Sequence, residues 1–95
     1  MSEFYIKSIE PGELIKENEK APERLIRVNI SSFKGRSNVE LIAEHDGAVI
    51  GETRFNLNIR ENMIDIFIRE SAGPRKIIFK LFYKGFNAGY YEADI

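Results

Sequence analysis

A regular alternation of apolar and polar side chains runs through this chain and constrains its fold more than any other feature. Side chains of a β-strand point alternately to opposite faces, so apolar residues at every second position predict a strand with one buried face. Ile26, Val28 and Ile30 follow this pattern, with Arg27 and Asn29 between them. Gly, Pro, Asn or Asp interrupts the alternation about every 8–15 residues, as turns do. We therefore predict seven strands that begin near residues 4, 24, 39, 48, 63, 76 and 88.

The interruptions differ in what they predict for the backbone. Asp46-Gly47 between two alternating runs predicts a tight β-hairpin. Gly51, inside the returning run, predicts a β-bulge. Residues 10–23 begin with Glu-Pro-Gly and carry one apolar pair, so we expect the first strand to end there and a charged connector to follow. Residues 85–89 contain two glycines and predict a long hairpin loop before the last strand.

Length and strand number together indicate the architecture. Ninety-five residues suit one domain, which we place at 1–95. Seven short strands joined by hairpins and loops predict an all-β, antiparallel two-sheet sandwich of immunoglobulin-like type. A five-stranded barrel of the oligonucleotide-binding type is the main rival. The rival requires strands to merge and a helix between the third and fourth strands, which this sequence does not offer.

Two parts of the chain resemble a known group of domains. The opening reads Ile-x-x-Ile-x-Pro, and after the charged connector it continues as Ile-Arg-Val-Asn-Ile-Ser. Later, Ile-Ile-Phe-Lys-Leu-Phe-Tyr-Lys-Gly precedes a glycine-containing turn and a final strand. These stretches resemble the first strands and the closing hairpin of immunoglobulin-like and fibronectin type III-like accessory sandwiches. The resemblance implies a module without catalysis of its own, of the kind found beside catalytic domains of carbohydrate-active enzymes and in adhesion or assembly proteins. Cysteine and tryptophan are absent, so the disulfide and core tryptophan of immunoglobulin domains are missing and no functional residue is carried over.

The residues that catalysis and metal binding require are scarce. His45 is the only histidine, and its position beside Asp46-Gly47 predicts an exposed turn residue. A zinc site takes three or four nitrogen or sulfur ligands, and the chain has no cysteine. We therefore predict no catalytic residue, no metal and no cofactor, and we expect that the protein is not an enzyme. A hydrolase built from scattered carboxylates remains an alternative.

Two charged residues stand inside strongly apolar strands. Asp65 is flanked by Ile64, Ile66 and Phe67, and Lys80 lies within the run from 77 to 83. We expect both charges to point outward and to oppose aggregation of these β-prone segments.

The alternation also predicts an apolar outer surface. If Ile77, Phe79 and Leu81 face the core, then Ile78 and Phe82 face outward, and the neighbouring strands add further apolar side chains. The predicted binding surface consists of Ile42, Ile50, Ile78, Phe82, Phe86 and Tyr90. An apolar centre with a charged rim is typical of a contact surface, so docking of another protein domain or of a second copy of the chain is our first interpretation. Coverage by the 10–23 connector, or the opposite assignment of the two faces, would also account for the pattern. In the remaining alternative Phe82, Phe86 and Tyr90 stack on sugar rings, as in a carbohydrate-binding module.

Charge and the first residues set the remaining expectations. A net charge of −1 provides no overall field for nucleic acid or an anionic membrane, so we expect neither as a partner. The first residues lack the basic and apolar regions of a signal peptide, and no run approaches the roughly 18 apolar residues of a membrane span. We expect a cytoplasmic protein, or an extracellular one if the chain is a domain excised from a longer secreted protein.

Overall fold

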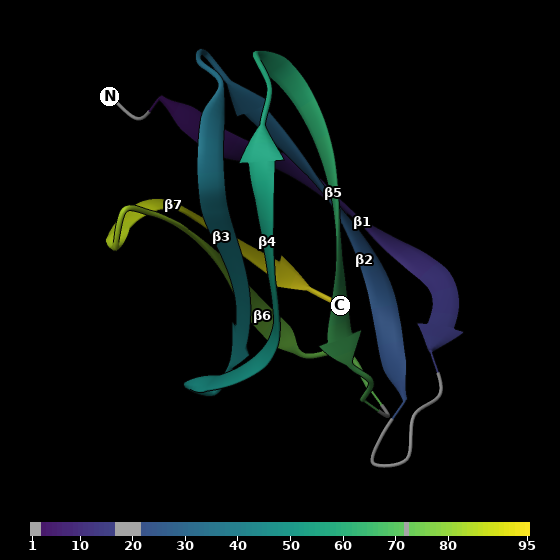
Figure 1. The fold of residues 1–95 in the computed structure, drawn as a ribbon. Coiled ribbons are helices and arrows are strands. Elements are labelled where there is room, and N and C mark those ends of the chain that lie inside the picture. The colour runs from purple at the N-terminus through teal and green to yellow at the C-terminus, as the bar shows by residue number, and fades with distance from the viewer. Residues whose placement is uncertain (1–2, 17–21, 72) are drawn as a thin grey trace.

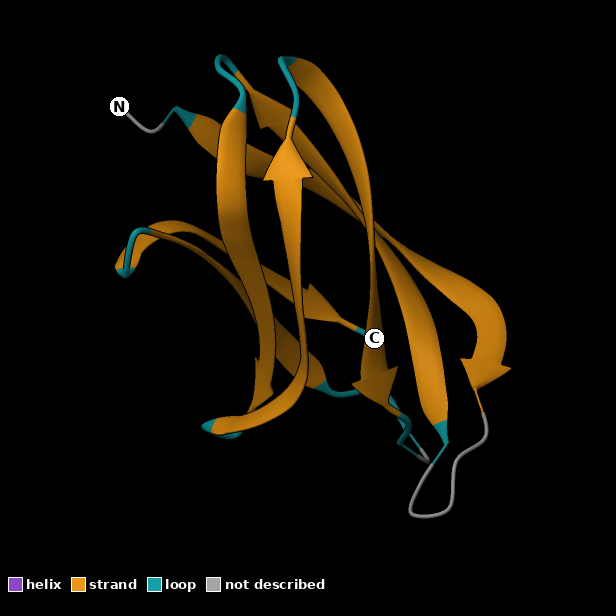
Figure 2. Ribbon diagram, viewed as in Figure 1, coloured by secondary structure: helices purple, strands orange, loops and turns teal. Residues whose placement is uncertain are grey.

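Two antiparallel β-sheets pack face to face in the computed structural model, which describes residues 3–16, 22–71 and 73–95 (Figures 1 and 2). This confirms an all-β sandwich of seven antiparallel strands. The strands are β1 (Phe4–Lys16), β2 (Glu23–Ser32), β3 (Arg36–His45), β4 (Ala48–Leu57), β5 (Arg60–Arg69), β6 (Lys76–Tyr83) and β7 (Phe86–Asp94). In the described part of the chain there is no helix, and so none that could cross a membrane.

The chain changes sheet at three connections. The first sheet has three strands in the order β1-β2-β5, and the second has four in the order β4-β3-β6-β7. The connections β2–β3, β4–β5 and β5–β6 cross between the sheets, while β1–β2, β3–β4 and β6–β7 join neighbours within one. The β2–β3, β4–β5 and β6–β7 turns therefore lie toward one end of the sandwich, and the β3–β4 turn lies at the opposite end.

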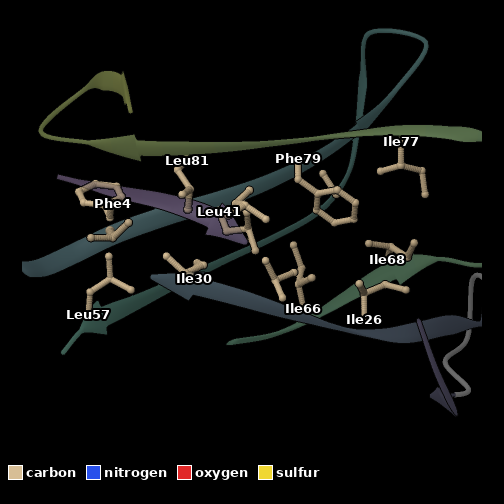
Figure 3. Close-up of a cluster of buried hydrophobic side chains, with 14 of the residues drawn as sticks. Phe4, Ile26, Ile30, Leu41, Leu57, Ile66, Ile68, Ile77, Phe79 and Leu81 are labelled. Atoms are coloured by element: carbon tan, nitrogen blue, oxygen red, sulfur yellow. The ribbon is translucent and has the colours of Figure 1, made fainter. Parts of the chain in front are cut away.

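The core lies between the two sheets and is almost entirely aliphatic (Figure 3). Ile26, Ile66 and Ile68 from the first sheet face Ile77 and Phe79 from the second, and all five are essentially inaccessible to solvent. Full burial of such a side chain contributes about 1.5–3 kcal/mol, which makes this layer the main source of stability. The remaining members of the core are Phe4, Ile6, Val28, Ile30, Val39, Leu41, Ala43, Ile50, Leu57 and Leu81.

Two hairpins close with tight two-residue turns. Asp46 and Gly47 have φ angles of 50° and 80°, as a turn with two left-handed residues requires, and this confirms the predicted hairpin. Lys84 and Gly85 have φ angles of 51° and 79°, so the last hairpin has the same construction. The predicted long loop at 85–89 is wrong, because β7 already begins at Phe86.

The first strand is longer than its sequence indicates. It was expected to end at Glu10-Pro11-Gly12, but pairing with β2 continues from Pro11 opposite Ile26 to Lys16 opposite Glu23. A proline is tolerated because β1 is an edge strand, and a register shift between Pro11 and Ile15 absorbs the irregular residues. The connector predicted at 10–23 therefore overlaps both strands, and its residues 17–21 lie outside the described residues.

The predicted bulge lies in β4. Gly51 pairs with Ala43 and Val49 pairs with Glu44, which leaves Ile50 as one extra residue between the two pairs. The same glycine also touches the other sheet, since a Cβ atom on it would overlap the carbonyl oxygen of Phe67 in β5. The bulge and this close contact bring the edges of the two sheets together at one corner.

Candidate functional site

The outer face of the four-stranded sheet is the surface that sequence analysis singled out. Residues directly opposite each other on neighbouring strands point to the same side of a sheet. Because Leu41 and Leu81 are opposite each other and buried, the pairs on either side of them point to solvent. Four of the six predicted residues lie on this outer face: Ile42, Ile78, Phe82 and Tyr90.

The apolar side chains of the outer face lie along a diagonal across its two central strands. Phe82 is opposite Glu40, Lys80 is opposite Ile42, and Ile78 is opposite Glu44. Phe82, Ile42 and Ile78 are therefore diagonal neighbours, about 7–8 Å apart between Cα atoms. All three are half-buried within the described chain.

One ion pair crosses the apolar diagonal between Ile42 and Ile78, and a second lies beside it. Lys80 Nζ lies 3.0 Å from Glu44 Oε2, and both side chains are largely covered. Arg54 Nε donates to Glu40 Oε2 at 3.2 Å. The alkyl stems of such long side chains cover neighbouring apolar surface, which explains why the three apolar residues are only half exposed. Lys80 therefore points outward as expected, although it is paired.

Tyr90 is the most exposed aromatic residue of the outer face. It lies opposite Lys80 and is 55% exposed. Its hydroxyl donates a hydrogen bond to Glu92 Oε1. This bond, followed by partial burial and the carboxylate charge, raises the pKa of Tyr90 above its ordinary value of 10.0. The hydroxyl is thus bound to Glu92, and the residue remains more than half exposed.

Ile50 does not belong to the outer face, and its assignment there is wrong. The bulge at Ile50 and Gly51 inserts one residue and reverses the alternation of β4 from that point. Ile50 consequently points into the core, while Val49 is exposed in its place.

Phe86 also lies elsewhere. It is opposite Tyr83, whose neighbours Phe79 and Leu81 at every second position face the core. Phe86 thus points to the inner side of the sheet, beyond the end of the sandwich, and is 76% exposed. The assignment to the outer face is wrong because β7 contains a bulge: Gly89 pairs with Leu81 and Asn87 pairs with Phe82, so the extra residue between them reverses the alternation. Phe82, Phe86 and Tyr90 consequently do not form one aromatic platform.

The candidate catalytic residues remain separate from one another. The Nδ1 atom of His45 lies 3.0 Å from the carbonyl oxygen of Lys76, and the Nε2 atom lies 3.3 Å from the carboxylate of Asp46. Asp65 points outward, as predicted, and accepts a hydrogen bond from Arg27 Nε at 3.1 Å. No group of three His, Asp or Glu residues suited to a metal ion occurs among the described residues.

A hollow of about 450 Å³ lies at the end of the sandwich where the chain finishes. Its floor contains Arg24, whose Nε and Nη2 atoms donate to the two carboxylate oxygens of Glu70 at 2.7 and 2.9 Å. These hydrogen bonds lower the pKa of Glu70 from its ordinary value. Arg24 and Glu70 therefore form a bidentate ion pair, and we assign the pair a structural role.

Sequence analysis missed a cluster at the opposite end, beside the β2–β3 and β6–β7 turns. Arg36 Nη2 and Nε donate to the carboxylate of Glu3 at 2.6 and 2.8 Å. These bonds lower the pKa of Glu3 and raise that of Arg36. Arg36 and the Nζ atom of Lys84 lie 5.8 and 5.4 Å from the ring centre of Tyr83. A repeated triplet could have signalled this cluster, because both turns read aromatic-Lys-Gly, as Phe33-Lys34-Gly35 and Tyr83-Lys84-Gly85.

Comparisons of the chain with protein families, with curated proteins and with solved structures found no match.

Proposed function

We propose that this chain is a non-catalytic interaction module that uses the outer face of its four-stranded sheet to contact another protein domain or a second copy of itself. The observation that carries the proposal is the apolar diagonal of Phe82, Ile42 and Ile78 across β3 and β6, the central strands of that sheet. The Lys80–Glu44 pair crosses this strip and Arg54–Glu40 adjoins it. Apolar side chains together with internally paired charges are compatible with a protein–protein contact.

The strand order supports an immunoglobulin-like or fibronectin type III-like identity. The orders β1-β2-β5 and β4-β3-β6-β7 match strands A-B-E and C′-C-F-G of that group. We propose this membership together with the role of an accessory or assembly domain that the resemblance implies. Fold alone assigns no partner, so the outer face provides the functional part of the proposal.

The charges on the outer face favour a partner over bare solvent. Lys80–Glu44 and Arg54–Glu40 are paired within the face, so a partner would not have to neutralise them. Lys80 and Glu44 are already largely covered, so they lose little conformational freedom when a partner covers them. The cost of docking is correspondingly small.

Molar mass in solution tests the proposal through the second-copy case. We expect a dimer for the wild type and a monomer for Phe82→Glu, measured by size exclusion with light scattering over a range of concentrations. Met63→Glu is the matched control, because Met63 is an exposed apolar residue on the outer face of the other sheet. A monomer in all three proteins rules out self-association. A dimer that only Met63→Glu breaks would place the contact on the three-stranded sheet and contradict the proposal.

Carbohydrate binding is the second candidate, favoured by the exposed and hydrogen-bonded ring of Tyr90. It would use Tyr90 with Phe82 beside it on the same face, and without Phe86. Screening on a glycan array checks it: binding that is lost in Tyr90→Ala supports the carbohydrate function, and absence of binding to any glycan removes it.

A further inference from the structure

The three most exposed large apolar side chains of the described residues share one feature. Phe33, Ile59 and Phe86 are 62%, 63% and 76% exposed, and each lies in or directly beside a turn. The turns are β2–β3, β4–β5 and β6–β7, which all lie at the same end of the sandwich. Apolar side chains in exposed turns contribute nothing to the core, and an aqueous setting does not favour them.

Two of these turns are direct neighbours. Ser32 and Arg60 are the last paired residues of β2 and β5. Phe33 directly follows Ser32, and Ile59 directly precedes Arg60. The N–H group of Phe33 donates to the carbonyl oxygen of Glu3 at 2.9 Å, which holds this turn against the start of β1. Figure 1 shows the β2–β3 and β4–β5 turns together at the top, while the β6–β7 hairpin projects to the left.

The same end carries a surplus of positive charge. Four cations lie in or beside the three turns: Lys34, Arg36, Arg60 and Lys84. The nearest carboxylates among the described residues are each bound to a cation: Glu3 to Arg36, with Lys34 Nζ 3.9 Å away, Glu61 to Lys7, and Glu40 to Arg54. Lys34 and Lys84 are 50 positions apart in the sequence, and the fold brings their turns to one end. A whole-chain net charge of −1 conceals this concentration.

We propose that this end docks on the surface of an anionic lipid bilayer, with Phe33 and Ile59 entering the interface and Lys34, Arg60 and Lys84 facing the lipid headgroups. Apolar side chains next to cations are what binding to such an interface requires, since the apolar groups leave water and the cations are drawn to the negative surface. This replaces our expectation that no membrane is a partner, which rested on net charge alone.

The shape of this end favours a bilayer over an acidic peptide. The apolar side chains protrude from turns, so they can enter a soft surface that has no pocket to receive them. Two hollows adjoin the turns, of about 460 and 270 Å³, and both contain Asn38 and Lys84. Most of the residues that line these hollows are polar or charged, whereas a peptide with apolar anchors needs an apolar groove.

The residue types also favour a bilayer over a single-stranded nucleic acid. Binding of bases without sequence preference relies on aromatic rings that stack on them. Ile59 has no such ring, yet it is as exposed as Phe33 and directly precedes Arg60, the partner of Ser32. Both side chains are suited to burial among lipid headgroups.

Vesicle sedimentation with the full chain tests the proposal. The probes are phosphatidylcholine vesicles with and without phosphatidylserine, at low and at physiological ionic strength. Each cation near an anionic surface raises membrane affinity roughly fivefold, so Lys34→Gln/Lys84→Gln should lower the partition coefficient about 30-fold. Phe33→Ser/Ile59→Ser should lower it at least about tenfold, because the apolar contribution is lost.

Matched controls separate this end from the rest of the surface. Arg69→Gln/Lys76→Gln removes the same charge at the opposite end, and Val49→Ser/Met63→Ser removes two exposed apolar side chains from strands. Both should bind like the wild type, and far-ultraviolet circular dichroism confirms that every variant is folded.

The outcomes decide the proposal. Binding that needs phosphatidylserine and is lost in both turn variants supports it. No sedimentation with anionic vesicles at low ionic strength overturns it. Binding that Phe33→Ser/Ile59→Ser leaves intact, together with equal binding to a single-stranded oligonucleotide, also overturns it, because the end would then be a site for any polyanion. These tests do not involve Phe82 or the outer face, so they stand apart from the proposed protein contact.

Discussion

Substitution of Gly51 by alanine tests the corner where the two sheets meet. An alanine Cβ at this position would overlap the carbonyl oxygen of Phe67, and it would lie 3.0 Å from Cγ2 of Ile68. Both neighbours belong to β5, and the first is a backbone atom that cannot rotate away. Overpacking of this kind costs about 1–3 kcal/mol. Replacement of a glycine also stiffens the unfolded chain, which returns about 0.4–1 kcal/mol.

We therefore expect Gly51→Ala to lower the free energy of unfolding by about 1–2 kcal/mol. For a domain of this size such a loss lowers the Tm by roughly 5–15 °C. Thermal unfolding followed by circular dichroism measures the Tm, and urea unfolding gives the free energy.

Two other glycines separate packing from backbone conformation. A Cβ atom on Gly73 would meet no atom of the described residues within 4 Å, and Gly73 has no positive φ, so Gly73→Ala should be neutral or slightly stabilising. Gly47 has equal space but a φ of 80°, so Gly47→Ala should cost about 1–2 kcal/mol from backbone conformation alone. If Gly51→Ala and Gly73→Ala have the same Tm, then β4 can move away from β5 at little cost. That result would refute the reasoning that a fixed corner places Ile50 in the core.

Three further predictions follow from single side chains. Glu92→Gln should bring the pKa of Tyr90 down toward 10.0, because the hydroxyl loses its carboxylate acceptor, and an ultraviolet titration of the phenolate checks this. The pKa of Glu70 is lowered in the folded state, so the carboxylate stabilises the fold fully above its ordinary pKa of 4.5 and loses this effect as pH falls through the lowered pKa. The free energy of urea unfolding should therefore depend less on acid pH in Glu70→Gln than in the wild type. An unchanged pH dependence would contradict this prediction. Asp65→Val should leave the fold intact but increase aggregation on heating, measured by light scattering, because the outward charge in β5 is removed.

Local pattern was sufficient to predict the strands and the first hairpin. Alternation at Ile26, Val28 and Ile30 reports directly on one buried face, and these side chains are indeed buried in β2. Asp46-Gly47 meets the φ requirements of its turn without help from distant residues. Such features depend on neighbours in the sequence and are therefore visible in it.

The errors arise where distant residues decide the local structure. The first strand continues through Pro11 because β2 offers a partner beyond it, which the sequence of β1 does not reveal. Ile50 points inward because an extra residue at the corner reverses the alternation. Phe86 lies on the opposite face from Tyr90 because an extra residue, Ala88, reverses the alternation of β7. One residue of slip in a strand exchanges its two faces, so a small error in a turn or bulge becomes a wrong surface.

The cationic end was overlooked for a related reason. Its charges belong to segments far apart in the chain, and net charge averages them with acidic residues elsewhere. The aromatic-Lys-Gly triplet of two turns was the available signal, but its meaning depends on the topology that places both turns at one end.

The most direct test of the proposed contact is a map of it. Amide chemical shifts, recorded by NMR as the wild-type concentration is raised, report which residues change surroundings on association. We predict changes confined to residues 40–44 of β3, residues 78–82 of β6 and Tyr90, and their absence in Phe82→Glu. Shifts that do not depend on concentration, or that change around Met63 on the other sheet, would contradict the claim that the outer face of the four-stranded sheet is the contact surface.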